Sequence, residues 1–166
     1  MSTITYGNSN MSVSSAGEIT MPSQPAFKIR AASIINDVTG NSTAYTVVFS
    51  TENYDQNSDA TSTTFTAPVT GIYEFKTAIA LNDVDADHTI GLLKIVSSNS
   101  TMTLYSNPAA LESSNGYVSL PASFSTDMDA ADTCTVLIQI FGGTDTINIF
   151  TTGAHSYSYF AGELLC

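Results

Sequence analysis

Charged residues are scarce in this sequence, and basic residues are the scarcest of them. Four lysines and arginines stand against fifteen aspartates and glutamates among 166 residues, which gives a net charge of -11 at pH 7. A chain with this charge is repelled by the phosphates of nucleic acids and by anionic lipid surfaces. We therefore expect neither nucleic acid nor a membrane as a partner.

Long apolar runs and targeting signals are also missing. No apolar run reaches the roughly 18 residues that indicate a transmembrane helix. The first residues, MSTITYGNSN, lack the basic and apolar segments of a secretory signal. The two cysteines, Cys134 and Cys166, are therefore expected as free thiols in a reducing compartment, although a disulfide between them stays open.

Sequence motifs for catalysis are absent as well. The chain has no Gly-x-Ser-x-Gly motif, no His-Glu-x-x-His motif and no glycine-rich phosphate loop. Its two histidines, His88 and His155, have no second ligand at a metal-binding spacing. We expect no catalytic residue and no enzymatic activity.

Three alternating aspartates, Asp83, Asp85 and Asp87, are the only candidate metal site. Carboxylates at this spacing can direct oxygen ligands at a hard cation such as calcium. An EF-hand loop starting at Asp83 would need Gly and Glu where this chain has His88 and Lys94. A solvated acidic loop is the simpler interpretation, and calcium is the only cofactor that the sequence suggests.

The apolar residues that are present follow a β pattern. Short runs of β-branched and aromatic residues alternate with turns rich in Ser, Thr, Asn and Gly, which is typical of an all-β sandwich or barrel. The pair Gly142–Gly143 predicts a hairpin turn between two of these runs. We predict strands near 26–32, 44–51, 62–67, 71–81, 88–96, 101–106, 116–125, 133–141, 146–151 and 157–165.

The apolar patterns of two predicted strands indicate which of their faces are buried. In 71–81 the large apolar residues occupy alternate positions, so one face of the strand belongs to the core. Residues 133–141 are apolar on both faces from Val136 onward, which is typical of a strand covered on both sides. The core of a sandwich covers one face only, and we expect a partner subunit to cover the other.

The first 24 residues differ from the rest and are predicted to form an arm. They contain only short strand-like pieces, at Ile4–Tyr6, Met11–Val13 and Ile19–Met21, which cannot bury a core by themselves. Pro22 and Pro25 mark the start of the globular domain. We expect residues 1–24 to order against a neighbour and residues 25–166 to form the head.

Five stretches resemble, in the right order, the globular head domain shared by C1q and tumour necrosis factor (TNF) proteins. They are PAF at 25–27, VVF at 47–49 followed by Asn53-Tyr54-Asp55, FTAPVTGIYEF at 65–75, MDAADTCTVLI at 128–138 and YFAGELL at 159–165. The pattern departs from the family at Ala131, where a Gly usually precedes the Asp, so the turn there is expected to differ.

The resemblance implies an all-β, ten-stranded jelly-roll β-sandwich that assembles as a homotrimer. The motif residues expected in its core are Phe27, Phe49, Phe65, Gly71, Tyr73, Phe75, Phe160 and Gly162. The candidates for the trimer interface are Lys28, Arg30, Leu137 and Phe141.

The arm resembles leader segments of the form SSSG…TMPxQPAF in structural proteins of bacteriophages, especially marine ones. This resemblance implies a non-enzymatic virion protein, assembled in the host cytoplasm and exposed on the virion surface. The arm would bind a capsid or tail protein of the particle. With a head, a short arm and no stalk between them, a trimeric capsid decoration or cement protein, or a short surface fibre or knob, is the expected role.

An alternative role stays open at this stage. The same head would serve as a receptor-binding domain that recognises a glycan or protein on the host surface. Tyrosine suits such contacts. The tyrosines that could take part are Tyr45, Tyr105, Tyr117, Tyr157 and Tyr159.

Overall fold

A computed structural model describes residues 11–113, 116–152, 155 and 157–166, and nearly all of their regular structure is β. The only helix among these residues is one turn, α1 (Pro108–Leu111), whose first turn is capped by the side chain of Asn107. None of the described helical structure is long and apolar enough to cross a membrane.

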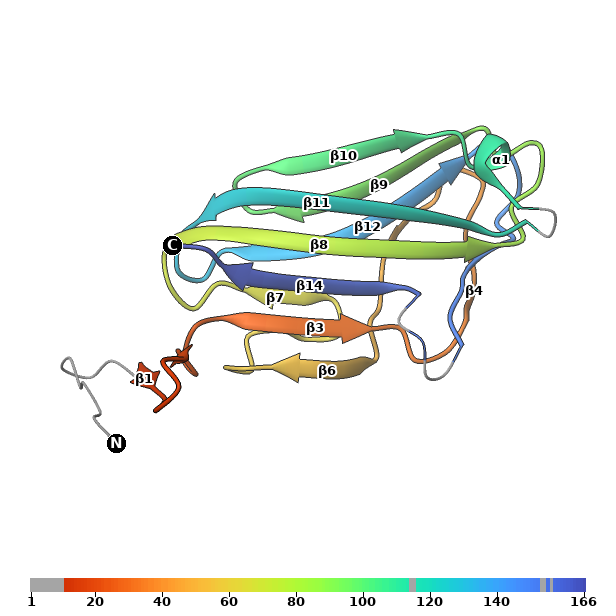
Figure 1. Cartoon of the computed structure of the whole chain (residues 1–166). Coiled ribbons are helices and arrows are strands. Elements are labelled where there is room, and N and C mark those ends of the chain that lie inside the picture. Colours follow the sequence, from red (N-terminus) through yellow and green to blue (C-terminus); the bar gives the residue numbers. More distant parts are fainter. Residues whose placement is uncertain (1–10, 114–115, 153–154, 156) are drawn as a thin grey trace.

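Two antiparallel sheets pack face to face and form the predicted jelly-roll β-sandwich (Figure 1). The seven-stranded sheet runs in the order β4 (Ile35–Thr39), β13 (Ile147–Ile149), β8 (Gly71–Asn82), β14 (Tyr159–Leu164), β3 (Ala26–Arg30) and β6 (Thr51–Asp55), and β11 (Val118–Met128) pairs with β8. The five-stranded sheet runs in the order β10 (Thr101–Ser106), β9 (Ile90–Ser97), β12 (Thr133–Phe141) and β5 (Ala44–Thr46), and β7 (Thr64–Thr66) also pairs with β12.

The predicted strand at 44–51 is wrong, because the chain changes sheets within it. β5 ends at Thr46 in one sheet, and β6 begins at Thr51 in the other. Between them Val47 and Phe49 are buried; Val47 N–H donates to Val136 O of β12 at 2.9 Å, whereas Phe49 N–H donates to Ser62 O at 2.6 Å, outside either sheet. Because the buried apolar residues continue through the segment between β5 and β6, the sequence pattern resembles that of one continuous strand.

The predicted hairpin at Gly142–Gly143 is also wrong. The strands on either side, β12 and β13, belong to different sheets, so these glycines carry the chain across the sandwich. Gly142 has φ +104°, and a Cβ atom there would lie 2.1 Å from the carbonyl oxygen of Asp87. Glycine is therefore required by a close approach to the neighbouring loop.

Six aromatic rings form the centre of the core. All six are buried between the sheets, with Phe27 stacked on Phe65 at 4.8 Å and packed edge-on against Phe160 at 5.0 Å. Offset and edge-to-face ring pairs are favourable beyond the area they bury. The six are the motif aromatics Phe27, Phe49, Phe65, Tyr73, Phe75 and Phe160.

The two motif glycines lie where a side chain has no room. A Cβ atom on Gly162 would lie 2.7 Å from the rings of both Phe27 and Phe75. A Cβ atom on Gly71 would lie 2.5 Å from the carbonyl oxygen of Cys166. Gly162 thus lets the rings close over β14, and Gly71 lets the C-terminal residues pass beside β8.

The turn before β12 keeps a left-handed residue at the position where Ala131 departs from the C1q/TNF pattern. Ala131 has φ +77°, a conformation that usually favours glycine. Its N–H donates to Ala67 O at 2.8 Å, and Ala67 N–H donates to Asp132 O at the same distance. These bonds hold Ala131 in a conformation that its side chain disfavours.

Replacing Phe75 with alanine should lower the free energy of unfolding by about 3–5 kcal/mol, because it empties a fully buried ring site. Chemical denaturation measures this loss. Val69→Ala, at an exposed position on the loop before β8, should change the stability by about 0.5 kcal/mol or less. Equal losses in the two variants would show that Phe75 is not a core residue.

Candidate functional site

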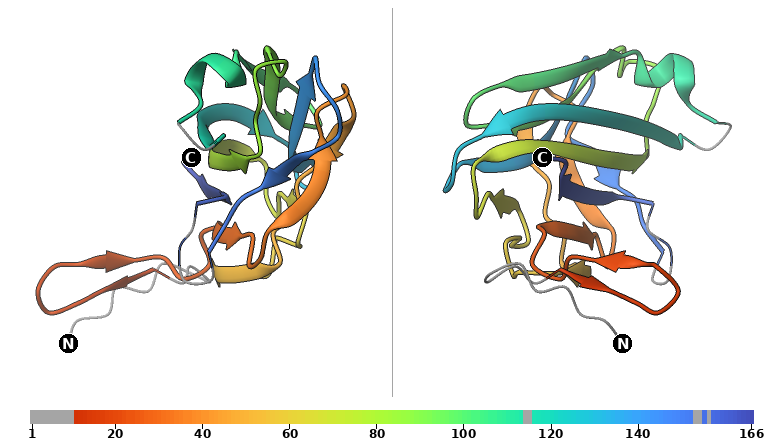
Figure 2. Two further views of the ribbon diagram at one scale, coloured as in Figure 1. Left: turned by 90° about the vertical axis from the view of Figure 1, so that its right-hand side faces the viewer. Right: turned by 60° about the vertical axis from the view of Figure 1, so that its left-hand side comes forward.

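The arm ends in a small hairpin that extends away from the sandwich (Figure 2). β1 (Ser12–Val13) pairs with β2 (Ile19–Thr20), and the turn between them is closed by Ser14 N–H donating to Glu18 O at 2.9 Å. The Ser14 hydroxyl accepts from Glu18 N–H and donates to the Glu18 carboxylate. Gly17, with φ +88°, supplies the left-handed residue of the turn.

The apolar side chains in and next to the hairpin are exposed to solvent. Ile19 is 63% exposed and Met21 is 49% exposed. A two-stranded hairpin alone is marginally stable in water. The two strands of the hairpin hydrogen-bond to each other, whereas its apolar side chains are exposed. This arrangement suits docking against another protein surface.

A short connection ties the hairpin to the base of the sandwich. Gln24 donates its side-chain N–H to Leu164 O at 2.7 Å, and Leu164 N–H donates to Pro25 O at 3.0 Å. The Asn57 side chain donates to Ser23 O at 3.0 Å. The chain between the arm and β3 is thus held by the C-terminal strand and by the loop after β6.

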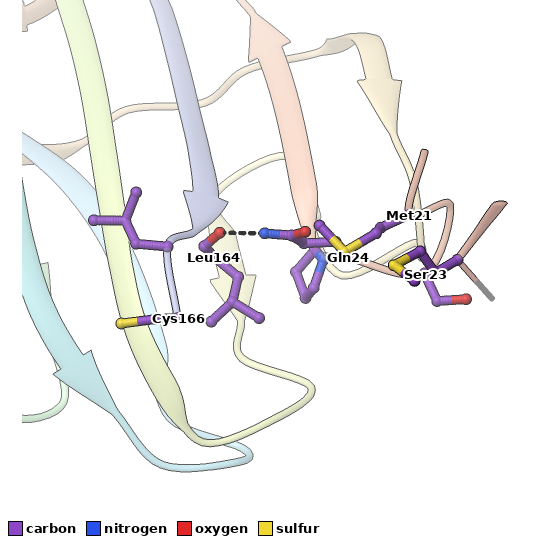
Figure 3. Close-up of a pocket in the computed structure, with 8 residues that line it drawn as sticks. Met21, Ser23, Gln24, Leu164 and Cys166 are labelled. Carbon is purple, nitrogen blue, oxygen red and sulfur yellow. Dashed lines mark hydrogen bonds between the residues drawn. The ribbon is translucent and has the colours of Figure 1, made fainter. Parts of the chain in front are cut away.

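An apolar pocket of about 430 Å³ lies where this connection meets the C-terminal residues (Figure 3). Its lining residues are Met11, Met21, Ser23, Gln24, Pro25, Leu164, Leu165 and Cys166. Cys166 is fixed against β8 by Ile72 N–H, which donates to Cys166 O at 2.8 Å. This pocket could not be identified from the sequence, because the residues on its two sides are about 140 positions apart along the chain. The sequence feature that could have indicated the pocket is the apolar pair Leu164-Leu165, which follows the core positions of β14.

Further exposed apolar residues extend this surface. Val69 on the loop before β8, Ile72 at the start of β8 and Leu165 are each about half exposed. Contiguous apolar surface of this kind marks interaction sites on soluble proteins. We call the hairpin, the pocket and these three residues the base, and it is the candidate docking site.

Two of the predicted interface residues, Lys28 and Arg30, lie on the outer face of the seven-stranded sheet. Both are half-buried and alternate with the buried Phe27 and Ile29. The ammonium group of Lys28 lies 4.7 Å from the centre of the Tyr159 ring, close enough for a cation–π interaction.

Lys76, on the same outer face, forms ion pairs with two carboxylates. Its Nζ lies 2.8 Å from Glu74 and 3.2 Å from Glu163. The hydrogen bonds to Glu74 and then Glu163 raise the pKa of Lys76. Lys76 therefore carries a positive charge at neutral pH, and its side chain is exposed.

The other two predicted interface residues, Leu137 and Phe141, lie on the opposite side of the sandwich. On β12 the residues at alternate positions from Cys134 to Ile140 are buried, while Leu137 and Phe141 face outward and are half-buried. The structure therefore does not bring the four candidates into one patch.

The carboxylates of two of the three candidate calcium ligands, Asp83 and Asp85, accept hydrogen bonds from different donors. The Asp83 carboxylate accepts hydrogen bonds from the side chains of Asn82 and Asn148, at 3.0 and 2.6 Å. The Asp85 carboxylate accepts from Asp87 N–H at 3.1 Å. Within the described residues, no three His, Cys, Asp or Glu side chains gather as a metal ion requires. The structure gives the calcium hypothesis no support.

His88 is a buried structural residue. Its ring is fully buried, with Nδ1 accepting from Asp85 N–H at 3.1 Å and Nε2 lying 3.2 Å from Thr144 O. A Cβ atom on Gly143 would lie 2.3 Å from Nε2. The ring holds two loops together at the end of the sandwich opposite the base. His155 is exposed, with its ring 5.4 Å from that of Tyr157.

Comparison with known proteins identifies the fold. No family model and no curated protein matches the sequence. Two crystal structures of murine APRIL superpose on the chain with TM-scores of 0.56 and 0.55 at 13% and 16% identity, each covering 86% of this chain and 99% of that chain. The globular domain of zebrafish complement 1qA protein gives a TM-score of 0.49 at 19% identity, covering 86% and 98%. The chain has the C1q/TNF-like jelly-roll fold.

In this C1q/TNF-like head the two cysteines are free and lie in contrasting surroundings. Cys134 is buried in β12, and Cys166 is exposed at the base. Burial raises the pKa of the Cys134 thiol to about 12. Since the thiolate is the reactive form, Cys134 is inert at neutral pH.

A thiol reagent applied near pH 8 should therefore label the exposed Cys166 and spare the buried Cys134. Absorbance of the released chromophore should correspond to one thiol per folded chain and to two after unfolding in guanidinium. A Cys166→Ser variant should give no signal until it is unfolded. Fast labelling of that folded variant would contradict the burial of Cys134.

Proposed function

We propose that the protein is a non-enzymatic structural protein of a bacteriophage, displayed on the virion as a trimeric head and attached through its arm. The observation that carries the proposal is the base, where a hairpin followed by exposed apolar residues adjoins an apolar pocket. The role is that of a capsid decoration or cement protein, or of a short surface fibre.

The arm supplies the attachment. Its exposed residues Ile19 and Met21 add apolar contact area, which is worth about 25 cal/mol per Å² when buried. The resemblance of SSAGEITMPSQPAF to leader segments of phage structural proteins supports a capsid or tail protein as the partner. Many copies attached to one particle would add avidity to a modest contact.

Charge favours the outer face of the seven-stranded sheet as the surface where copies meet. Lys28, Arg30 and Lys76 lie there, and Lys94 is the remaining basic residue of the chain. Copies that each carry a net charge of -11 repel one another least where basic residues offset the acidic ones. Small residues such as Ala78 and Ala161 flatten this face and allow close approach.

Geometry separates the two pairs of interface candidates. The outer faces of two packed sheets point in opposite directions. Copies joined through both faces would stack into a row, because a closed ring needs surfaces related by a closing rotation. This argument supports Lys28 and Arg30 as the residues of the proposed trimer interface, in preference to Leu137 and Phe141.

The purified protein should sediment as a trimer at micromolar concentration, and Lys28→Glu should shift it toward monomer because the variant adds repulsion to the shared face. Lys94→Glu makes the same charge change on the other sheet and should leave the trimer intact. Circular dichroism checks that both variants are folded. A monomeric wild-type protein, or equal dissociation by the two variants, would contradict the proposed interface.

The attachment is tested with phage particles that carry the protein. Capsids stripped of it should rebind the recombinant wild-type protein, whereas the double variant Ile19→Ser, Met21→Ser should fail to cosediment with them because the docking contacts are lost. Ile34→Ser, at an apolar residue of similar exposure outside the base, is the matched control. Binding by the double variant at wild-type level would rule out attachment through the arm.

Copy number distinguishes decoration from receptor recognition. Quantitative mass spectrometry of purified particles should give a copy number comparable to that of the major capsid protein for a decoration protein. A receptor-binding head would instead be present in a few copies at the tail. That result would replace the decoration role and keep the docking of the arm.

A further inference from the structure

The five-stranded sheet differs from the rest of the chain in its charge. Its strands, as the structure describes them, contain no aspartate or glutamate, although the chain has fifteen acidic residues. In the seven-stranded sheet, by contrast, β4, β6, β8, β11 and β14 each contain an acidic residue. The only basic residue among the five strands is Lys94 on β9. The outer face of this sheet is therefore nearly uncharged.

The end of that outer face farther from the base is apolar (Figure 1). Directly paired residues of neighbouring strands point to the same face of a sheet. Phe141 pairs with Ile90, and Leu92 lies between Tyr105 and β12. Ile90 is 50% exposed and Tyr105 is 73% exposed, while Phe141 is half-buried. We call this surface the outer patch, and its residues are Ile90, Leu92, Tyr105, Leu137 and Phe141.

The two ends of the outer patch carry opposite charges. At one end Lys94 pairs with Leu137, and no carboxylate in the described part of the chain forms an ion pair with Lys94. At the other end Asp87 is exposed in the loop before β9, where Thr89 N–H donates to Asp87 O at 2.9 Å. A strand rises by about 3.3 Å per residue, so Lys94 lies roughly 13 Å from Ile90 along β9, and Asp87 lies beyond Ile90.

The outer patch is separate from the proposed trimer interface. That interface uses the outer face of the seven-stranded sheet, whereas the patch lies on the opposite side of the sandwich. In a trimer joined through the seven-stranded sheet, the five-stranded sheet of each copy points away from the shared contact. Its large exposed side chains then form apolar surface of the kind that marks an interaction site.

We propose that the outer patch binds the outer patch of a second copy of this chain, in a neighbouring trimer, with the two β9 strands antiparallel. A two-fold contact of this kind uses the same surface on both copies, so the surface must be complementary to itself. The antiparallel arrangement places the apolar residues of the two patches against each other. It also places Lys94 of each copy opposite Asp87 of the other, so two ion pairs border an apolar centre.

Charge favours a second copy as the occupant. One charge of each sign at opposite ends of the patch is the pattern that a two-fold contact requires, and such pairs fix the orientation of a contact. Copies with a net charge of -11 repel one another least where a surface carries no acid. This contact rests on the proposed function for the crowding of many copies on one particle, which strengthens a modest affinity. It links neighbouring trimers and so reinforces the shell.

Sedimentation of the intact protein tests the contact. The weight-average mass should rise above that of the trimer at millimolar concentration. The double variant Ile90→Ser, Tyr105→Ser should stay at the mass of the trimer, because it removes the most exposed apolar side chains of the patch. Ile34→Ser changes an exposed apolar residue outside the patch and should associate like the wild type. Circular dichroism checks that the variants are folded.

Exchange of the two charges tests the antiparallel arrangement. Lys94→Glu places like charges opposite each other at both ends of the contact and should weaken the association by roughly tenfold or more. Asp87→Lys should weaken it in the same way. The combined variant Lys94→Glu, Asp87→Lys keeps the net charge of the chain and should restore the association, because the two charges have exchanged places.

Chemical cross-linking locates the two-fold axis. Gln139, which pairs with Leu92, lies near the centre of the patch. In a Cys166→Ser background, Gln139→Cys should therefore be joined to the same position of a second copy by a short bismaleimide. Thr135→Cys lies four residues farther along β12, roughly 26 Å from its counterpart across the axis, and should not be joined.

The proposed contact is overturned if the mass stays at that of the trimer at every concentration, or if the serine variant associates like the wild type. It is also overturned if the combined charge variant associates no better than the single variants. Loss of capsid rebinding by the serine variant, with self-association unchanged, would assign the patch to the capsid protein instead. A wild-type protein that forms dimers through the patch and no trimers would refute the trimer and keep this contact, so the two proposals fail separately.

Discussion

The packing of six aromatic rings between the two sheets is the constraint on which the rest of the structure depends. The rings of Phe27 and Phe75 close over β14 only because Gly162 has no side chain, so the C-terminal strand can lie between β3 and β8. That placement brings Leu164 and Cys166 beside the connection to the arm. The core of the head and the candidate docking site at its base are therefore set by the same contacts.

The core could be predicted because its signal is local and periodic. Alternate apolar residues in β8 and the motif around Pro68 and Gly71 predict a core strand after a corner, and the jelly-roll fold is confirmed. Chain crossings between the sheets could not be predicted. Residues 47–50 continue an apolar pattern while changing sheets, and β4 contains Asn36 and an Asp37 with φ +55°, which interrupt any strand pattern.

The candidate sites required contacts between residues far apart in the sequence. The arm and the tyrosines could be picked out in the sequence, but only the fold joins Met21 to Leu165 or brings Tyr105 and Phe141 to one face of a sheet. The spacing of Asp83, Asp85 and Asp87 suggested a common ligand, whereas the carboxylates of Asp83 and Asp85 accept hydrogen bonds from different donors. Spacing describes proximity along the chain and leaves the direction of each side chain open.

The pairing of β3 with β14 has a consequence for folding. The first strand of the sandwich lies between β6 and the last strand, so the seven-stranded sheet stays incomplete until residues from the two ends of the head have met. Sheets dominated by such distant pairings fold slowly. The rate at which the head folds therefore depends on this long-range contact more than on any local hairpin.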